Sequence, residues 1–153
     1  MATTTGTNNL YDKVKEKLLD GTIDLDDDTF QVMLLTNAYT PNQATHEFVS
    51  DIVAQEVGGG TGYVRQTLTT VQWIVSGGAN GQMKFDADNP QWAASGGNIV
   101  ARYWALFKDD VGGDSTSPLL AYGLLDDTPA DVTTTDGNTL TLNVNVNGFF
   151  TVG

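Results

Sequence analysis

Three acid-rich segments hold the residues best suited to bind a metal ion or to catalyse a reaction: Asp20–Asp28, Phe85–Trp92 and Lys108–Asp114. A calcium loop of the EF-hand type needs a glycine at position six and a glutamate at position twelve. Counted from Asp24, these positions hold Thr29 and Leu35, so the first segment does not match and a solvated turn is favoured there. Aspartate is also an ordinary turn residue, so calcium at the other two segments remains an open alternative. We assign no metal ligand.

Catalytic motifs find little support in the sequence. His46 is the only histidine, so a Ser–His–Asp arrangement would have to use it, and the strained nucleophile turn G-x-S-x-G does not occur. The glycine-rich stretch Val57–Val64 lacks the Lys–Ser/Thr pair of a phosphate-binding loop. Paired carboxylates that cleave glycosides stay open, because their separation in space is invisible in a sequence. We predict no enzymatic activity, no catalytic residue and no cofactor.

The three tryptophans allow two interpretations. Trp73, Trp92 and Trp104 could form a platform on which sugar rings stack, as in a glycan-binding module. Each also lies in or beside an expected strand, where burial in a core or a subunit contact is the commoner fate.

Charge excludes some partners. Nineteen Asp and Glu against seven Lys and Arg give a formal net charge of −12, which repels a phosphate backbone. No apolar run approaches the roughly 18 residues of a membrane helix, and residues 1–9 lack the features of a secretory signal. We predict neither a nucleic-acid nor a membrane partner. A chain used in a bacterial cytoplasm, or exported inside a larger particle, is the simplest expectation.

The apolar spacing predicts the elements that position these residues. An amphipathic helix is expected over Leu10–Asp20, with Leu19 widening its apolar stripe, and a weaker helix over Thr45–Gln55. Strands are expected over the remaining apolar runs: Thr29–Thr36 (covered on both faces), Gly62–Ser76, Gln82–Ala87, Asn98–Lys108, Pro118–Leu125 and Asn138–Gly148. Two runs alternate clearly. The first places Ile99, Ala101, Tyr103, Ala105 and Phe107 on one face, and the second places Leu140, Leu142, Val144 and Val146 on a dry face.

Short strands joined by glycine-rich turns indicate a mostly β fold. We predict an antiparallel β-sandwich, jelly-roll-like, with one N-terminal amphipathic helix. The expected organisation is a flexible N-terminal arm over residues 1–9 and a single β-sandwich domain over residues 10–153.

The segment Asn143–Gly153 is unusually apolar for the end of a sequence. Phe149, Phe150 and Val152 predict a last strand, Asn143–Val152, that locks into the core or into a neighbouring subunit, two alternatives of equal weight. Deleting residues 148–153 should abolish foldedness or oligomers. Together with Leu10 and Tyr11 these three residues form the predicted interface.

Several phrases of the sequence resemble small virion structural proteins of tailed bacteriophages and prophages, a family of capsid decoration or cement proteins. They are found in order over most of residues 8–126: Asn9–Ile52, Glu56–Leu68, Phe85–Ala93, Ala101–Asp109 and Ser117–Asp126. The resemblance implies a β-sandwich that sits on the outer surface of the capsid as a homotrimer and stabilises contacts between capsomers.

The implied partners are the chain itself and the major capsid protein, and the implied location is the virion, after assembly in host cytoplasm. The arm over residues 1–9 could reach a neighbouring subunit. A tail or fibre-associated virion protein, and a host-glycan-binding module, are the alternatives.

Overall fold

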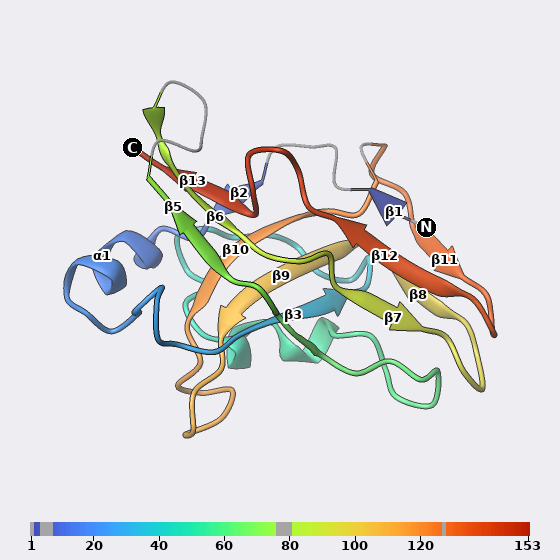
Figure 1. Ribbon diagram of the computed structural model, residues 1–153. Coiled ribbons are helices and arrows are strands. Elements are labelled where there is room, and N and C mark those ends of the chain that lie inside the picture. Colours follow the sequence, from blue (N-terminus) through green and yellow to red (C-terminus); the bar gives the residue numbers. More distant parts are fainter. Residues whose placement is uncertain (1, 4–7, 76–80, 127) are drawn as a thin grey trace.

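The computed structural model describes residues 2–3, 8–75, 81–126 and 128–153 (Figure 1). The five-stranded sheet has the order β2 (Asn9–Leu10), β10 (Leu119–Leu124), β9 (Tyr103–Lys108), β3 (Phe30–Leu35) and β4 (Gln66–Thr67). Two three-stranded sheets have the orders β13 (Phe150–Val152), β6 (Met83–Asp86), β5 (Gln72–Ile74) and β1 (Ala2–Thr3), β12 (Thr139–Asn143), β7 (Gln91–Ala93). The fourth sheet pairs β8 (Ile99–Ala101) with β11 (Val132–Thr134).

The strand pairings in the described ranges are antiparallel except for β1 with β12. The helical elements of the same ranges are α1 (Lys13–Leu19) and the 3-10 turns Val49–Asp51 and Val53–Gln55. The prediction of a mostly β chain with antiparallel sheets is therefore confirmed.

Strand β3 lies within the five-stranded sheet, and both faces of the strand are buried. Phe30 and Leu34 point into the larger of two apolar cores, and Met33 and Leu35 point into the smaller one on the opposite face. The apolar run predicted to be covered on both faces is confirmed here.

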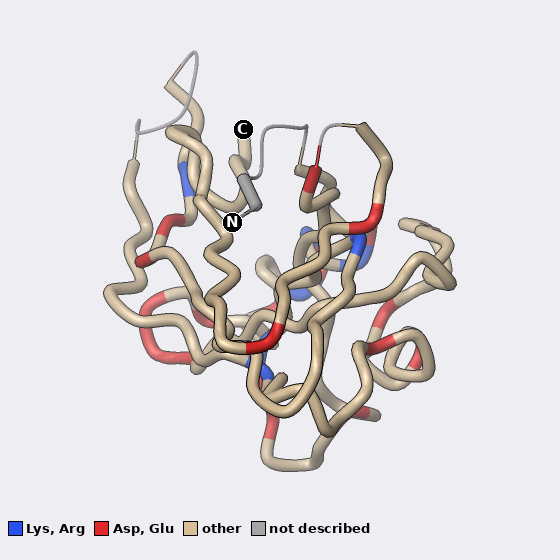
Figure 2. Tube along the Cα trace, turned by 90° about the vertical axis from the view of Figure 1, so that its right-hand side faces the viewer, with Lys and Arg blue, Asp and Glu red and all other residues tan. Residues whose placement is uncertain are grey.

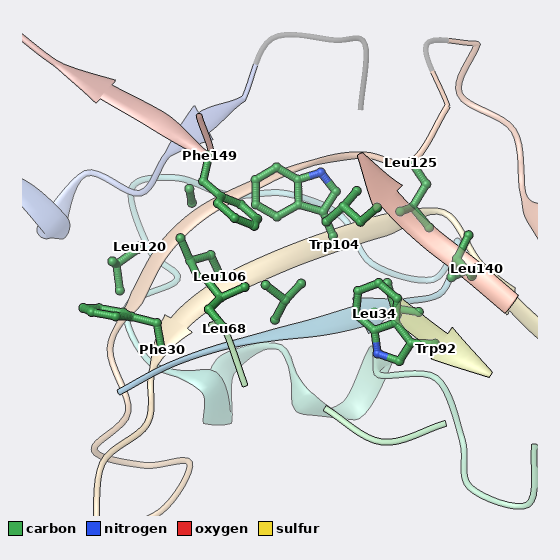
Figure 3. Close-up of a cluster of buried hydrophobic side chains, with 14 of the residues drawn as sticks. Phe30, Leu34, Leu68, Trp92, Trp104, Leu106, Leu120, Leu125, Leu140 and Phe149 are labelled. Atoms are coloured by element: carbon green, nitrogen blue, oxygen red, sulfur yellow. The ribbon is translucent and has the colours of Figure 1, made fainter. Parts of the chain in front are cut away.

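The larger core draws side chains from all four sheets. Trp104 and Leu120 come from the five-stranded sheet, Phe149 precedes β13, and Leu140 lies on β12 (Figure 3). This core therefore joins the sheets to one another, and its residues include Trp92 on β7 and Ile99 on β8.

The smaller core lies under the two 3-10 turns. Val49 and Ile52 cover the face of β3 and β9 that carries Met33 and Phe107, and Figure 1 shows these turns beside β3. The weaker helix expected over Thr45–Gln55 is found only in part: the chain forms two short 3-10 helices, Val49–Asp51 and Val53–Gln55, instead of one continuous helix.

The predicted face of Asn98–Lys108 is also wrong. Ile99 and Ala101 point into the larger core, but Ala105 and Phe107 point into the smaller one. Arg102 lies between β8 and β9, and the chain bends there. After the bend, the positions that face the larger core are shifted by one residue. The run therefore contributes one strand to each of two sheets.

The run expected as one strand over Gly62–Ser76 forms two short strands, β4 and β5. Thr70 between them has a φ of 53°, which interrupts an extended chain. Asp88 stabilises this turn, because its carboxylate accepts hydrogen bonds from the hydroxyls of Thr69 and Thr70.

The runs expected over Asn138–Gly148 and Asn143–Val152 are divided by a turn. Strand β12 ends at Asn143, and Val146, predicted to be on the dry face, is 82% exposed. The Asn145 side chain accepts a hydrogen bond from the Asn147 N–H, and its carbonyl accepts one from Gly148. An asparagine-led turn therefore reverses the chain before β13.

Helix α1 is shorter than the expected Leu10–Asp20. Leu10 belongs to β2, where it pairs with Ala121, so the backbone is extended before the helix begins. Leu19, expected to widen the apolar stripe, is 89% exposed.

Part of the expected arm, residues 1–9, lies outside the described residues. Where the structure describes it, Ala2 and Thr3 pair with Leu142 and Asn143, and Asn9 pairs with Tyr122. Within the described ranges, the chain forms no helix with the length and apolar character to cross a membrane.

Candidate functional site

The predicted interface residues from the two ends of the sequence meet where β2 lies beside β13 (Figure 1). The side-chain amide of Asn8 donates hydrogen bonds to the carbonyl oxygens of Phe149 (2.7 Å) and Gly148 (3.3 Å). Leu10 and Val152 both pack against the larger core. The fold thus brings together residues about 140 positions apart.

Three of the five predicted interface residues lie in the core of the chain itself. The exposed fractions of Tyr11, Phe149 and Phe150 are 0%, 1% and 4%. Leu10 and Val152 are partly exposed. Of the two alternatives for the phenylalanines, these contacts match the intramolecular one. A role of the five residues in a subunit interface stays a prediction.

Tyr11 is fixed by other tyrosines. Its hydroxyl lies 2.7 Å from that of Tyr39, and its ring centroid lies 5.0 Å from that of Tyr122. Burial raises the pKa of Tyr39 to about 12 and raises the pKa of Tyr11 further. Both hydroxyls therefore stay neutral at physiological pH, and the pair is a structural contact.

Phe149 and Phe150 close the larger core against Phe85. The Phe150 ring stacks on Phe85 with centroids 5.1 Å apart, and the Phe149 N–H donates to the Phe85 carbonyl oxygen at 2.8 Å. Phe149 also meets Trp104 edge to face, with centroids 5.5 Å apart.

Two surface grooves flank this junction. The first, the polar groove, has a volume of about 520 Å³ and is lined by Asn8, Asn9, Leu10, Tyr11, Asp12, Lys15, Gln43, Phe150 and Thr151. The second, the apolar groove, has a volume of about 550 Å³ and is lined by Lys15, Leu18, Leu19, Gly21, Ile23, Asp24, Leu25, Asp26, Trp73, Met83 and Val152. Because an open apolar groove of this size can bind a ligand or a partner's side chains, we take it as the candidate site.

The acid-rich segment Asp20–Asp28 forms one wall of the apolar groove. Its carboxylates bond to nearby backbone groups: Asp20 accepts from the Thr22 N–H and Asp24 from the Asp26 N–H. Asp28 also pairs with Lys108 at 3.0 Å. The segment is the turn between α1 and β3, as the sequence favoured.

The two acids of the segment Phe85–Trp92 bind different partners. Asp86 pairs with Lys84 at 2.9 Å, and Asp88 accepts hydrogen bonds from the turn at Thr70.

The segment Lys108–Asp114 contributes to an ion-pair network. Arg65 donates two hydrogen bonds to Asp114 (2.6 and 3.0 Å) and two to Glu56 (2.8 and 2.9 Å). Tyr63 adds a hydrogen bond from its hydroxyl to Glu56 and accepts one from the Leu34 N–H. The network ties two loops to β3 across a sequence separation that no pattern in the chain indicates.

Asp114→Asn should lower the free energy of unfolding by about 1 kcal/mol at neutral pH. The hydrogen bonds from Arg65 hold the pKa of Asp114 below its usual value. A depressed pKa contributes stability that is fully present above the unfolded pKa of about 3.9 and is lost as pH falls through the folded value. The difference between wild type and variant, measured by urea denaturation, should be constant near neutrality and shrink below about pH 4.

In an Arg65→Met background, Asp114→Asn should have no such effect, because the partner is gone. A stability difference that persists unchanged into acid would contradict the pairing.

His46 and the metal candidates show no cluster. Within the described ranges, no three His, Asp or Glu side chains gather where they could hold a metal ion. The His46 ring packs 5.7 Å from the Tyr39 ring, and its buried Nδ1 has no hydrogen-bond partner among the described residues.

The three tryptophans do not form a common platform. Trp92 and Trp104 are buried in the larger core, which is the commoner arrangement for a tryptophan in a strand. Trp73 is partly buried and lines the apolar groove.

Comparison of the chain with protein-family models, with curated proteins and with solved structures found no match. Sequence reasoning missed most of the apolar groove, including Leu18, Leu25 and Met83. The sequence had pointed to three parts of its lining for other reasons: Val152 as an interface residue, Trp73 as part of a possible sugar platform, and the acid-rich segment Asp20–Asp28.

Proposed function

We propose that this protein is a structural protein of tailed-phage virions that decorates the outer surface of the head. It binds there as a homotrimer, with the major capsid protein as its partner, and stabilises the contacts between capsomers. The resemblance of its sequence phrases to such proteins supports this proposal.

The observation that carries the proposal is the apolar groove on a strongly acidic molecule. Leu19, Trp73 and Met83 leave apolar surface at the groove, and such surface on an otherwise polar protein marks a place where another molecule binds. Acidic positions are spread over the loops and basic ones are few (Figure 2). Such a charge suits the outside of a head better than its DNA-facing interior.

The finer architecture belongs to the same proposal. We take the fold to be a jelly-roll-like sandwich, in which the five-stranded sheet forms one layer. The support is that the larger core joins β3 and β9 to Phe85 of β6 and Leu140 of β12.

The test is the location of the protein in particles of a phage that encodes it. Heads and tails are separated on a density gradient, and the protein is quantified in each by mass spectrometry. We expect it in the heads, and we expect the purified protein to sediment with three times the mass of one chain. Heads that lack it should disrupt at a lower temperature, and added protein should restore them. Its presence in tails alone, or in neither fraction, would contradict the proposal.

A glycan-binding role is the second candidate, favoured by the presence of Trp73, Asp24 and Asp26 in the lining of one groove. It predicts that Trp73→Ala abolishes adhesion to host glycans while particles still assemble.

A further inference from the structure

The floor of the apolar groove is the uncovered part of a sheet face. The register pairs Trp73 with Phe85, Phe85 with Phe150, and Met83 with Val152, so these side chains share one face of the β5–β6–β13 sheet. Phe85 and Phe150 are buried in the larger core, whereas Trp73, Met83 and Val152 are only partly buried. The inner face of the sheet thus extends beyond the core that covers it.

The opposite wall comes from the end of α1 and the turn that follows. Leu18 and Leu25 pack partly against the larger core, and Leu19 is almost fully exposed at the rim. Tryptophan and methionine, which lie on the floor, are enriched at protein interfaces, where they supply large or adaptable apolar contacts. The groove therefore has the composition of a protein-binding surface.

The charges on the rim favour a basic partner. Asp24 and Asp26 line the groove, and Asp20 and Asp27 are exposed in the same turn. In the described part of the chain, which includes all seven Lys and Arg, these four acids make no ion pair. Six of the seven cations already pair with other acids of the chain, and only Lys15 remains at the groove.

A second copy of this chain would add further negative charge to this rim, so electrostatics disfavours it as the occupant. A cationic segment gains attraction from Asp24 and Asp26 and contact with the face of Trp73.

We propose that the apolar groove is the docking site for a peptide segment of another protein that carries large apolar side chains next to lysine or arginine. The apolar side chains fill the space between Leu19 and Trp73, and the cations lie against Asp24 and Asp26. The inference rests on the proposed function in one respect: if the protein decorates phage heads, the bound segment belongs to a protein of the virion shell.

The probe is a display library of random short peptides, selected on the purified wild-type protein. We expect enriched peptides to combine large apolar residues with Lys or Arg. Their affinity, measured by titration calorimetry, should fall about tenfold or more for Leu19→Glu and for Asp24→Asn/Asp26→Asn. Added salt should weaken binding to the wild type.

Matched controls separate the groove from general effects. Val146→Glu makes the same kind of change at another exposed apolar residue. Asp126→Asn/Asp136→Asn removes two charges elsewhere. Like Asp24, these carboxylates accept backbone N–H bonds, from Thr128 and Gly96, through an oxygen that asparagine retains. Both controls should bind the selected peptides as the wild type does.

Several results would overturn the inference. These are no enrichment, enrichment of acidic or purely polar peptides, equal binding by Leu19→Glu, or a change in oligomer mass on Leu19→Glu, which would make a second copy the occupant. Failure of the proposed function alone would give a different result: peptides would bind the groove, but heads would take up no protein. If heads take up Leu19→Glu as readily as wild type, the proposed function stands and the groove proposal fails.

Discussion

Replacing Phe149 by alanine should lower the free energy of unfolding by about 3–5 kcal/mol. The ring is buried between Trp104 and Phe85, and the Phe149 backbone is held by Asn8 and by the Phe85 carbonyl. Truncation leaves a cavity that strands on two sheets cannot easily close, because both are fixed by their own pairings. Urea denaturation followed by tryptophan fluorescence measures the loss.

Val146→Ala is the matched control, since Val146 is exposed in the same segment and its truncation should change stability by less than about 0.5 kcal/mol. The Phe149→Ala loss should be the same at every protein concentration, because the contacts lie within one chain. A loss that grows on dilution would instead assign Phe149 to a subunit interface.

Gly148→Ala should cost roughly 3 kcal/mol or more, from two separate causes. Gly148 has a φ of +75°, a conformation that costs an alanine about 1–2 kcal/mol. An added Cβ would also collide with the carbonyl oxygen of Phe85. That oxygen accepts the Phe149 N–H, so moving it weakens the attachment of β13 to β6.

Gly137→Ala isolates the first cause. Gly137 has a φ of +82°, and an added Cβ would have no atom within 4 Å. Thermal and urea denaturation of this control should show only the loss of about 1–2 kcal/mol from the backbone. Equal losses for the two alanine variants would mean that the close approach at Phe85 does not exist in solution.

A strand could be predicted where an apolar run is long and lies in the centre of a sheet. The run Thr29–Thr36 differs from β3 by one residue at each end, because burial on both faces leaves a continuous apolar pattern. The segment after Asn143 was harder, because alternation in the sequence continues to Val146 while the chain already turns at Asn145. Hydrogen bonds between an asparagine side chain and the neighbouring backbone, here the Asn147 N–H, override an alternating pattern.

The bend at Arg102 shows what alternation cannot reveal. The partners of Arg102 are distant in sequence: the guanidinium pairs with Asp131 at 2.8 Å, and the carbonyl accepts a hydrogen bond from the Leu125 N–H. On each side of the bend the residues still alternate between the two faces. The change of face at Arg102 therefore cannot be recognised from the sequence.

The candidate site was predictable only in parts. Leu10, Tyr11, Phe149, Phe150 and Val152 were predicted as one interface, but Tyr11, Phe149 and Phe150 are buried within the chain, and Val152 alone of the five lines the apolar groove. The apolar groove depends on how α1 and the turn after it face β5 and β6, which is a tertiary relation. Nothing in the neighbourhood of Met83 indicates Leu19 as its counterpart across the groove.

The internal pairing of Lys and Arg has a consequence for how copies of the protein behave together. With six cations matched to acids of the same chain, eleven described Asp residues without an ion pair remain to dominate the electric field outside the molecule. At physiological ionic strength this field decays over a Debye length of about 8 Å, and in dilute buffer it reaches much further. A concentrated solution should therefore remain free of aggregates in dilute buffer, and association beyond the proposed trimer should increase only when dissolved ions screen the mutual repulsion.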